Sequence, residues 1–344
     1  MTMNSKPFHE SRRQQFLYED LYEKTRINQF EILDVEKNNT ELATQGSEAQ
    51  TSAYEMIYLE QLWVWMLDYT AGISLEELAP RISAIVDAFE TWNEMDQFFQ
   101  QKAADQFPEY GPYQYTGAPV FSVLSDYEDT LQLLSIAILL RDFHSIRRII
   151  HALRSHRGVD GLFEQLVGGY VDDEQALDNC VLGQPYDTLL QAFYEEDQHA
   201  AVELVKEYLN VWYPAMKDHP RWYDGHLRIR KEGHAPYYGY WAFEAGATAY
   251  LLDLDDGQIN HLVYPKDLVD YARKLREEDR YTSEDIDISP HWGRVEGGES
   301  CPRAGFWETP AKSNSRRLFK KDEIMPVFEA SEYGHTIWQW SEEQ

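Results

Sequence analysis

The chain has 344 residues, of which 43% are hydrophobic and 14% aromatic, so it contains enough apolar material for a packed core. Its formal net charge of −29 excludes an ordinary nucleic-acid-binding or anionic-membrane-binding protein, because both bind through Lys and Arg. No apolar run approaches the ~20 residues that span a bilayer, and Met1 to Glu10 lacks the apolar stretch of a signal peptide. We therefore predict a cytoplasmic protein without membrane contact or direct nucleic-acid binding.

The predicted elements begin with helices. Apolar residues recur at helical spacing between Gly, Pro and Ser breakers, and Ser74 with Glu77 forms a capping-box pattern at the start of one helix. In the first half of the chain this pattern predicts helices over residues 11–42, 49–70, 75–101, 122–140 and 143–154. In the second half it predicts helices over residues 161–171, 186–194, 198–213, 234–252 and 265–280. His219 to Gly233 is expected to be an exposed connector.

The last segment has a different pattern. After Pro290 the sequence consists of short β-like pieces between turns, and the final piece alternates apolar and polar residues as a strand does. The pieces are residues 306–307, 318–319, 324–325 and 336–340. The predicted fold is therefore mainly α, a bundle of antiparallel helices followed by a small β-rich module. The predicted domains are residues 1–158, 159–289 and 290–344.

The negative charge is concentrated in one part of the chain. Residues 43–205 contain 27 acidic and seven basic residues, and no Lys or Arg occurs between Asp160 and Val205. Such a field favours fast capture of a basic partner. Two alternatives remain open: the charge serves solubility, or the Arg-rich segment 141–159 folds back onto neighbouring carboxylates.

No pattern of residues indicates catalysis, a metal or a cofactor. Asp253 to Gly257 resembles the start of a calcium loop, but the glycine and the final glutamate of that motif are not in register. His144, His151 and His156 lack the spacing of a metal-ligand pair. The two cysteines, Cys180 and Cys301, are expected to be reduced. We predict no enzyme activity, no cofactor and no metal.

Two residues in the helix predicted over 234–252 suggest a structural role. Trp241 and Glu244 lie three residues apart and share one face of that helix. Glu244 is then half-buried and needs an Arg or a hydrogen-bond partner. We favour a core ion pair over a direct contact with a partner.

Two stretches carry a resemblance to a known family. The sequences YYGYWAFEAGATAYLLDLDD (residues 237–256) and YPKDLVDYA (residues 264–272) resemble the C-terminal domain of PoNi proteins, which are immunity proteins for PoNe-type DNase toxins of polymorphic and type VI secretion systems. Residues 10–155 look like the N-terminal domain of the same family. The motif residues are Trp241, Glu244, Tyr264, Pro265 and Asp267.

The tail carries a second resemblance. The sequence GESCPRAGFW (residues 298–307), with the later SRRLF, MP and WQW, is similar to a small module of other polymorphic-toxin immunity proteins. This module is not part of the usual PoNi pattern, so the class of toxin stays open. Its motif residues are Cys301, Pro302, Gly305, Trp307, Trp338 and Trp340.

The resemblance implies a cytoplasmic, non-enzymatic protein that binds and neutralises a toxin. A nuclease toxin is expected to have a basic cleft for phosphates, and a carboxylate-rich surface could occupy it. The predicted contact residues are Asp172, Asp173, Glu174, Asp178, Glu195, Glu196, Asp253, Asp255 and Asp256. The alternatives are an enzyme that reverses a toxin's modification and an adaptor of a secretion system. The sequence leaves the oligomeric state open, with a homodimer as one alternative.

Overall fold

The chain forms two compact units, Met1–Leu275 and Arg276–Gln344, and each has its own hydrophobic core. The computed structural model describes residues 7–106, 117–173, 175–219, 221–284, 294–301, 305–309, 311–312, 315–320, 323–328 and 336–340. None of the helices in these ranges is long and apolar enough to cross a membrane.

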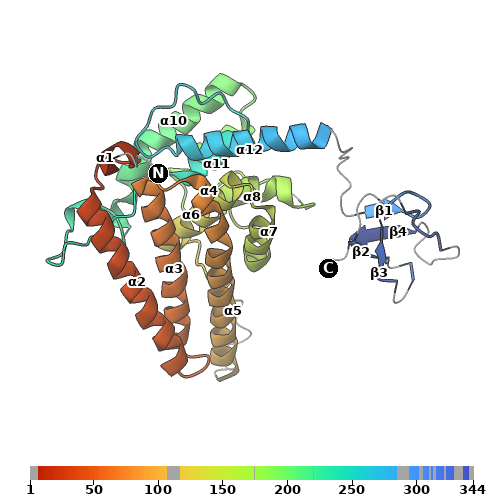
Figure 1. Ribbon diagram of the computed structural model, residues 1–344, viewed down its shortest axis with the longest axis horizontal. Helices are drawn as coiled ribbons and strands as arrows, with labels where there is room; N and C mark the ends of the chain where they lie inside the picture. The colour runs from red at the N-terminus through yellow and green to blue at the C-terminus, as the bar shows by residue number, and fades with distance from the viewer. Residues whose placement is uncertain are drawn as a thin grey trace, which may run out of the picture. The chain divides into compact units, whose positions relative to one another are not determined.

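The first unit is built from α-helices (Figure 1). In chain order they are α1 (Phe8–Ser11), α2 (Glu19–Leu42), α3 (Glu48–Ala71), α4 (Leu75–Leu78), α5 (Ile82–Gln106), α6 (Leu124–Leu139), α7 (Phe143–Ala152), α8 (Gly161–Val167), α9 (Tyr186–Tyr194), α10 (Gln198–Ala215), α11 (Phe243–Leu251) and α12 (Lys266–Glu284). α12 continues past the boundary between the units. The mainly α fold class is confirmed.

Three long helices form one layer of this unit. α3 lies between α2 and α5, and all three run side by side (Figure 1). α3 is buried on nearly every side beyond Ile57, because its aromatic and aliphatic residues face neighbours all around it. The Ser47 side chain caps its first turn by accepting a hydrogen bond from the Gln50 amide at 3.2 Å.

The remaining helices bury the rest of the core. α6 is buried along almost its whole length and packs on α7 and α11, while α9 packs on α10. One continuous set of buried apolar residues extends from Leu17 to Ala272, so helices on both sides of residue 158 share it. The predicted division of the sequence at residue 158 stays a prediction.

Most predicted helices are present, with three corrections. Residues 12–18 are not helical, so the helix predicted over 11–42 begins only at Glu19, as α2, and the short α1 precedes it. Ser74 caps a helix as expected, accepting from the Glu77 amide at 3.3 Å, but this helix ends at Leu78. A 3-10 turn containing Pro80 separates it from α5, because proline has no amide hydrogen to continue the α-helical hydrogen bonds.

The third correction concerns residues 235–242, which were predicted to be helical. They form an irregular segment, and α11 begins only at Phe243. Gly239 has a φ of +108°, and a Cβ there would lie 2.1 Å from Oγ1 of Thr70. Because this segment must approach α3 so closely, tertiary packing overrides its helical pattern.

The second unit contains a four-stranded antiparallel sheet with the order β1-β4-β2-β3. The strands are β1 (Arg294–Glu296), β2 (Gly305–Glu308), β3 (Arg317–Phe319) and β4 (Ile337–Trp340). The β-rich module is thus confirmed; β1 was not predicted, and Ile324 forms only an isolated bridge to Ser300.

The core of the sheet module consists of tail-motif residues and their neighbours. Cys301, Trp307 and Trp338 are buried together with Phe319 and Met325. Gly305 lies in β2 and Trp340 in β4, whereas Pro302 falls outside the described residues. Cys301, Trp307 and Trp338, the motif residues whose side chains the structure describes, therefore have a structural role.

Candidate functional site

The α9–α10 pair presents acidic side chains to solvent because α10 has two different faces. Asp197 caps α10 by accepting a hydrogen bond from the Ala200 amide at 2.8 Å. One face of α10 is apolar and buried, and includes Val205, Tyr208 and Trp212. The opposite face carries the exposed Glu203 and Glu207.

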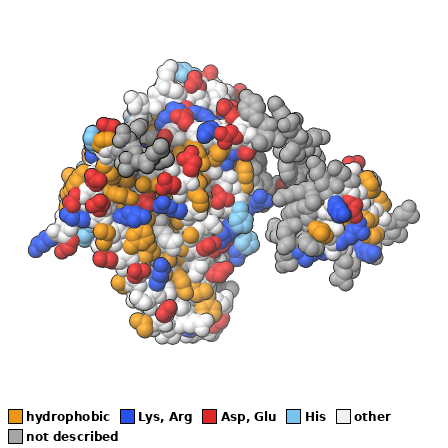
Figure 2. Space-filling model, viewed as in Figure 1, with side chains coloured by type: hydrophobic (Ala, Val, Ile, Leu, Met, Phe, Trp, Pro, Cys, Tyr) orange, Lys and Arg blue, Asp and Glu red, His pale blue; other side chains and the backbone are white. Residues whose placement is uncertain are grey.

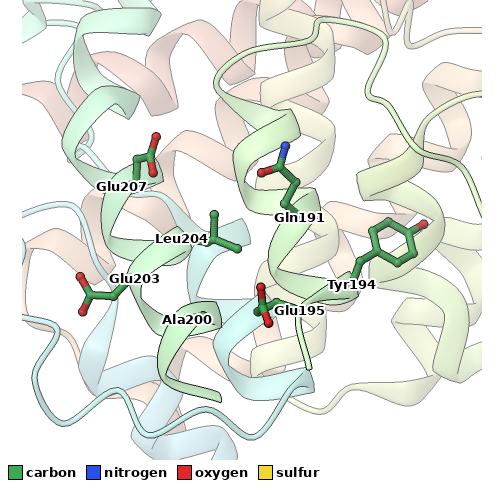
Figure 3. A pocket seen from close by; sticks show the side chains of 7 residues that line it. All are labelled: Gln191, Tyr194, Glu195, Ala200, Glu203, Leu204 and Glu207. Carbon is green, nitrogen blue, oxygen red and sulfur yellow. The ribbon is translucent and has the colours of Figure 1, made fainter. Parts of the chain in front are cut away.

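A groove runs between these two helices (Figure 3). Its volume is about 600 Å³, and we call it the acidic groove. Leu204 and Ala200 point into it from α10, and three glutamates surround them (Figure 3). Its lining residues are Gln191, Tyr194, Glu195, Ala200, Glu203, Leu204 and Glu207. The groove therefore offers a small apolar surface edged by carboxylates.

Four of the predicted contact residues lie on two adjoining turns. Glu195 and Glu196 follow α9, Asp253 and Asp255 follow α11, and all four are exposed. The side-chain Nε2 of Gln198 donates to the Leu252 carbonyl at 3.4 Å, which joins the two turns. We call Glu195, Glu196, Asp253 and Asp255 the acidic ridge.

The other predicted contact residues are more scattered. Asp172, Asp173 and Asp178 are exposed on the loop after α8, but Asp173 is paired with Arg157 at 3.0 Å. The Tyr194 hydroxyl donates to the Leu177 carbonyl at 2.9 Å, which ties this loop to the end of α9. Glu174 falls outside the described residues.

Asp256 does not belong to this surface, contrary to the prediction. It is only 2% exposed, and its carboxylate accepts from the Tyr264 hydroxyl at 2.6 Å and from Arg273 at 2.5 Å. Burial alone would raise the pKa of Asp256, but these hydrogen bonds and the nearby cations outweigh it and lower the pKa. Asp256 thus stabilises the junction of α11 and α12, where a partner does not reach it.

The Arg-rich segment partly folds back onto neighbouring carboxylates, as one alternative expected. Arg148 pairs with Asp87 at 2.5 Å and also with Glu90. Arg157 pairs with Glu164 at 3.0 Å as well as with Asp173. On the face shown in Figure 2, acidic and basic side chains are interspersed over the helical unit. These cations therefore neutralise part of the negative field locally.

The motif residues at 241–267 hold helices together. Trp241 donates to Oγ1 of Thr70 at 2.8 Å, and Asp267 binds Arg13 and the hydroxyl of Tyr69. Pro265 packs so closely on α11 that a Cβ on Gly246 would lie 2.7 Å from its ring. These contacts join the segment before α11 to α3, α12 to Arg13 and α3, and the residue before α12 to α11, so the motif is structural.

No Lys, Arg or His within the described part of the chain pairs with the buried Glu244, so the predicted core ion pair is wrong. Its Oε1 accepts from the hydroxyl of Tyr208 at 2.5 Å, and only 1% of the residue is exposed. Burial raises the pKa of Glu244 to about 8, and the nearby Glu128 adds to this effect. The carboxyl group is therefore mostly protonated at neutral pH and acts as a hydrogen-bonding group.

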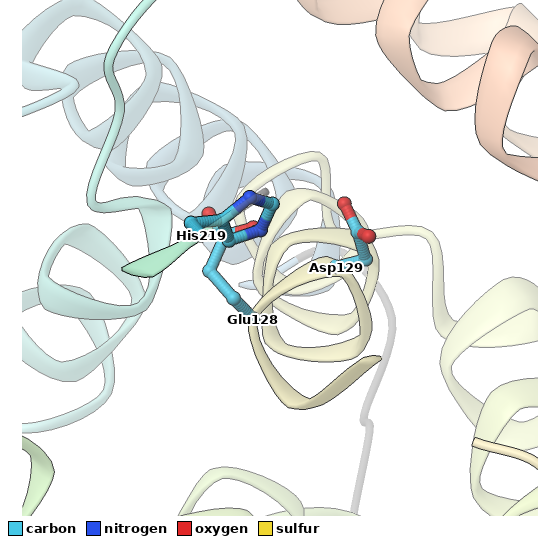
Figure 4. A group of neighbouring side chains, drawn as sticks. All are labelled: Glu128, Asp129 and His219. Atoms are coloured by element: carbon cyan, nitrogen blue, oxygen red, sulfur yellow. The ribbon is translucent and has the colours of Figure 1, made fainter. Parts of the chain in front are cut away.

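A buried polar cluster lies where an exposed connector was predicted. Glu128, Asp129 and His219 offer three ligand atoms within 4.8 Å of one another (Figure 4). Arg221 donates to Asp129 at 2.6 Å and to Glu55 at 2.8 Å. Burial raises the pKa of Asp129 to about 7, with the Glu128 charge as the second cause. The sequence pattern did not predict this cluster, because Asp129 and Arg221 are 92 residues apart along the chain.

The contacts of this cluster favour a packing role over a cation site, because Arg221 already pairs with Asp129. Nδ1 of His219 accepts from the backbone amide of Arg221 at 3.4 Å, so the proton of a neutral ring lies on Nε2. Nε2 faces Oε2 of Glu128 at 3.4 Å. A metal would require the Nε2 lone pair and would compete with Arg221 for Asp129. The arrangement supports packing between α6 and the segment after α10.

Comparison with known proteins bears on the region that holds the acidic ridge. Residues 158–268 match the family described as PoNe immunity proteins (PoNi), C-terminal. The crystal structure of protein PA2201 from Pseudomonas aeruginosa is similar, with a TM-score of 0.59 and 20% identity over 77% of this chain and 92% of that chain. At this identity the likeness establishes the fold alone. No curated protein sequence matches the chain.

Proposed function

We propose that this protein neutralises a secreted toxin by binding it stoichiometrically, because residues 158–268 match the C-terminal region of PoNe immunity proteins (PoNi). The proposal includes action in the cytoplasm of the producing cell, where a toxin of a type VI or other polymorphic secretion system would arrive. The cognate toxin is proposed to be basic, as a nuclease with a phosphate-binding cleft would be.

One observation carries the proposed mode of binding. The acidic ridge and the acidic groove adjoin within the matched region, and they share Glu195. The segment from Asp160 to Val205 contains no Lys or Arg, and in the groove Glu203 pairs with the following Lys206 at 2.7 Å. Exposed carboxylates of this kind can take the positions of phosphates in a basic cleft, which would block the toxin's substrate surface.

Co-expression with the toxin tests this proposal in cells. A variant with Lys at Glu195, Glu196, Asp253 and Asp255 is expected to lose protection against the toxin encoded beside it. The matched control places Lys at Glu23, Glu31, Asp34 and Glu41, which are exposed on α2 and change the net charge equally. The control is expected to protect.

The outcomes separate the mechanism from general charge effects. If both variants are folded and abundant and both protect, the ridge is not the binding surface. If the ridge variant and the α2 control both lose protection, the change in net charge is responsible for the loss. A chain that protects while failing to bind the toxin would contradict stoichiometric neutralisation and favour an enzymatic mechanism.

A further inference from the structure

A projecting loop, residues 225–232, differs in charge from the surface described above. It lies after α10, at the left-hand edge of the helical unit in Figure 1. Leu227 is 70% exposed and Ile229 is 48% exposed. The exposed cations Arg228, Arg230 and Lys231 lie beside them, with one acid, Glu232. We call this segment the basic loop.

The base of the basic loop is fixed from both sides. A Cβ on Gly225 would lie 1.8 Å from the Pro236 carbonyl oxygen, so the two chain segments are in direct contact. Nδ1 of His226 lies 2.6 Å from the hydroxyl of Tyr240, and Arg228 donates to the carbonyl of Arg221 at 2.8 Å. The loop is therefore held in one conformation before any partner binds.

The tip is ordered as well. The amide of Arg230 donates to the His234 carbonyl at 2.8 Å, and the amide of Gly233 donates to the Arg230 carbonyl at 2.9 Å. Single exposed apolar residues are common on proteins. Leu227 and Ile229, however, lie together on an ordered tip that is flanked by cations. Such a surface loses little conformational entropy on binding.

The position of the loop limits what it can contact. α10 has 18 residues and is about 27 Å long, and the turn carrying Glu195 precedes it. The basic loop starts beside its other end, where the Tyr213 hydroxyl donates to Asp224 at 2.7 Å. A single protein domain of ordinary size, roughly 30 Å across, can reach both ends of such a helix. Both elements also lie within the region matched to the immunity family.

We infer that the basic loop is a second contact element for the toxin, and that it binds an apolar hollow edged by carboxylates on the toxin surface. This inference rests on the proposed function. Leu227 and Ile229 would enter the hollow, while Arg230 and Lys231 would pair with the surrounding carboxylates. The interface would then use opposite charges at the two ends of α10, which fixes the orientation of the toxin as well as attracting it.

Calorimetric titration of the full chain with the toxin domain encoded beside it tests this inference. Leu227→Asp is expected to weaken binding at least tenfold, and Lys231→Glu roughly threefold to tenfold. The matched controls are Leu42→Asp and Lys37→Glu, at exposed positions on α2. They are expected to bind within about twofold of the unchanged chain, because they lie outside the contact.

The outcomes distinguish this inference from the proposed function. If the unchanged chain does not bind the toxin, the proposed function fails. If it binds and both loop variants bind equally well, the inference is overturned while the function stands. If the loop variants instead change the oligomeric state measured by light scattering and leave toxin affinity intact, the loop contacts a second copy, which also overturns the inference.

Discussion

For Glu244, the sequence pattern predicted the shielded position of the side chain but not the residue that it contacts. Its spacing from Trp241 correctly indicated that it is shielded, but the sequence could not identify the partner. Tyr208, which supplies the hydrogen bond, lies 36 residues earlier and belongs to another helix. The local sequence around a buried glutamate can be the same whether or not a cation pairs with it. Only the residues that pack around it in the folded protein differ.

The raised pKa of Glu244 predicts a pH-dependent stability. Its pKa is about 8 in the folded state against the ordinary value of 4.5, so between those values the unfolded chain releases a proton that the folded chain keeps. The free energy of unfolding should therefore fall as pH rises from about 5 to about 8. Glu244→Gln should remove the contribution of Glu244 to this slope and stabilise the protein at pH 8 by roughly 4 kcal/mol.

Urea unfolding at pH 5.5 and at pH 8 checks this expectation. Glu60 also has a pKa raised to about 8 by burial, so the Glu244→Gln variant keeps the part of the slope that Glu60 contributes. Glu207→Gln, at an exposed position, is the control and should leave the slope unchanged. An equal slope in Glu244→Gln and in the unchanged chain would contradict the assignment of a protonated Glu244.

Arg221 is predicted to be the main stabilising cation of the buried cluster. Arg221→Met leaves Asp129 and Glu55 without their guanidinium partner, and an uncompensated buried charge typically costs about 3–5 kcal/mol. Adding Asp129→Asn should recover part of that loss. Arg230→Met, on the exposed basic loop, is the control. Denaturant unfolding that gave equal stability for Arg221→Met and the control would contradict this role.

At the scale of elements, amphipathic and strongly apolar helices were well predicted, and close backbone contacts were not. α9 matches its predicted bounds, because its apolar residues recur regularly and turn residues delimit it. Residues 235–242 have an equally apolar pattern but fold as an irregular segment against α3. The same limit explains why the acidic ridge required the structure: its two turns are far apart in sequence and meet only through packing.

Gly225 provides a test of one close contact. Gly225→Ala forces a methyl group against the Pro236 carbonyl, so it should destabilise the protein by about 2–3 kcal/mol and displace the basic loop. Gly169→Ala is the control, because nothing lies within 4 Å of the position its methyl group would take. Thermal unfolding of the two variants provides the measurement. A tolerated Gly225→Ala would contradict the rigid attachment of the loop.

At the scale of the whole molecule, the net charge of −29 gives the protein a negative field, but charge alone does not define a site. Part of the charge is paired internally, as at Arg148 and Arg157, and part is buried, as at Asp256. The matched region also carries an exposed set of carboxylates at the ends of α9 and α11. The sequence predicted the charge and the fold class, and the structure selects the carboxylates that a partner can reach.

The most direct test of the central claim is the affinity of the chain for its toxin domain as a function of salt concentration. The account predicts a one-to-one complex whose dissociation constant rises steadily between 50 and 500 mM NaCl, by roughly tenfold or more. It also predicts a much smaller salt dependence when Glu195, Glu196, Asp253 and Asp255 are replaced by Gln or Asn. Tight binding that is independent of both salt and these four carboxylates would contradict it.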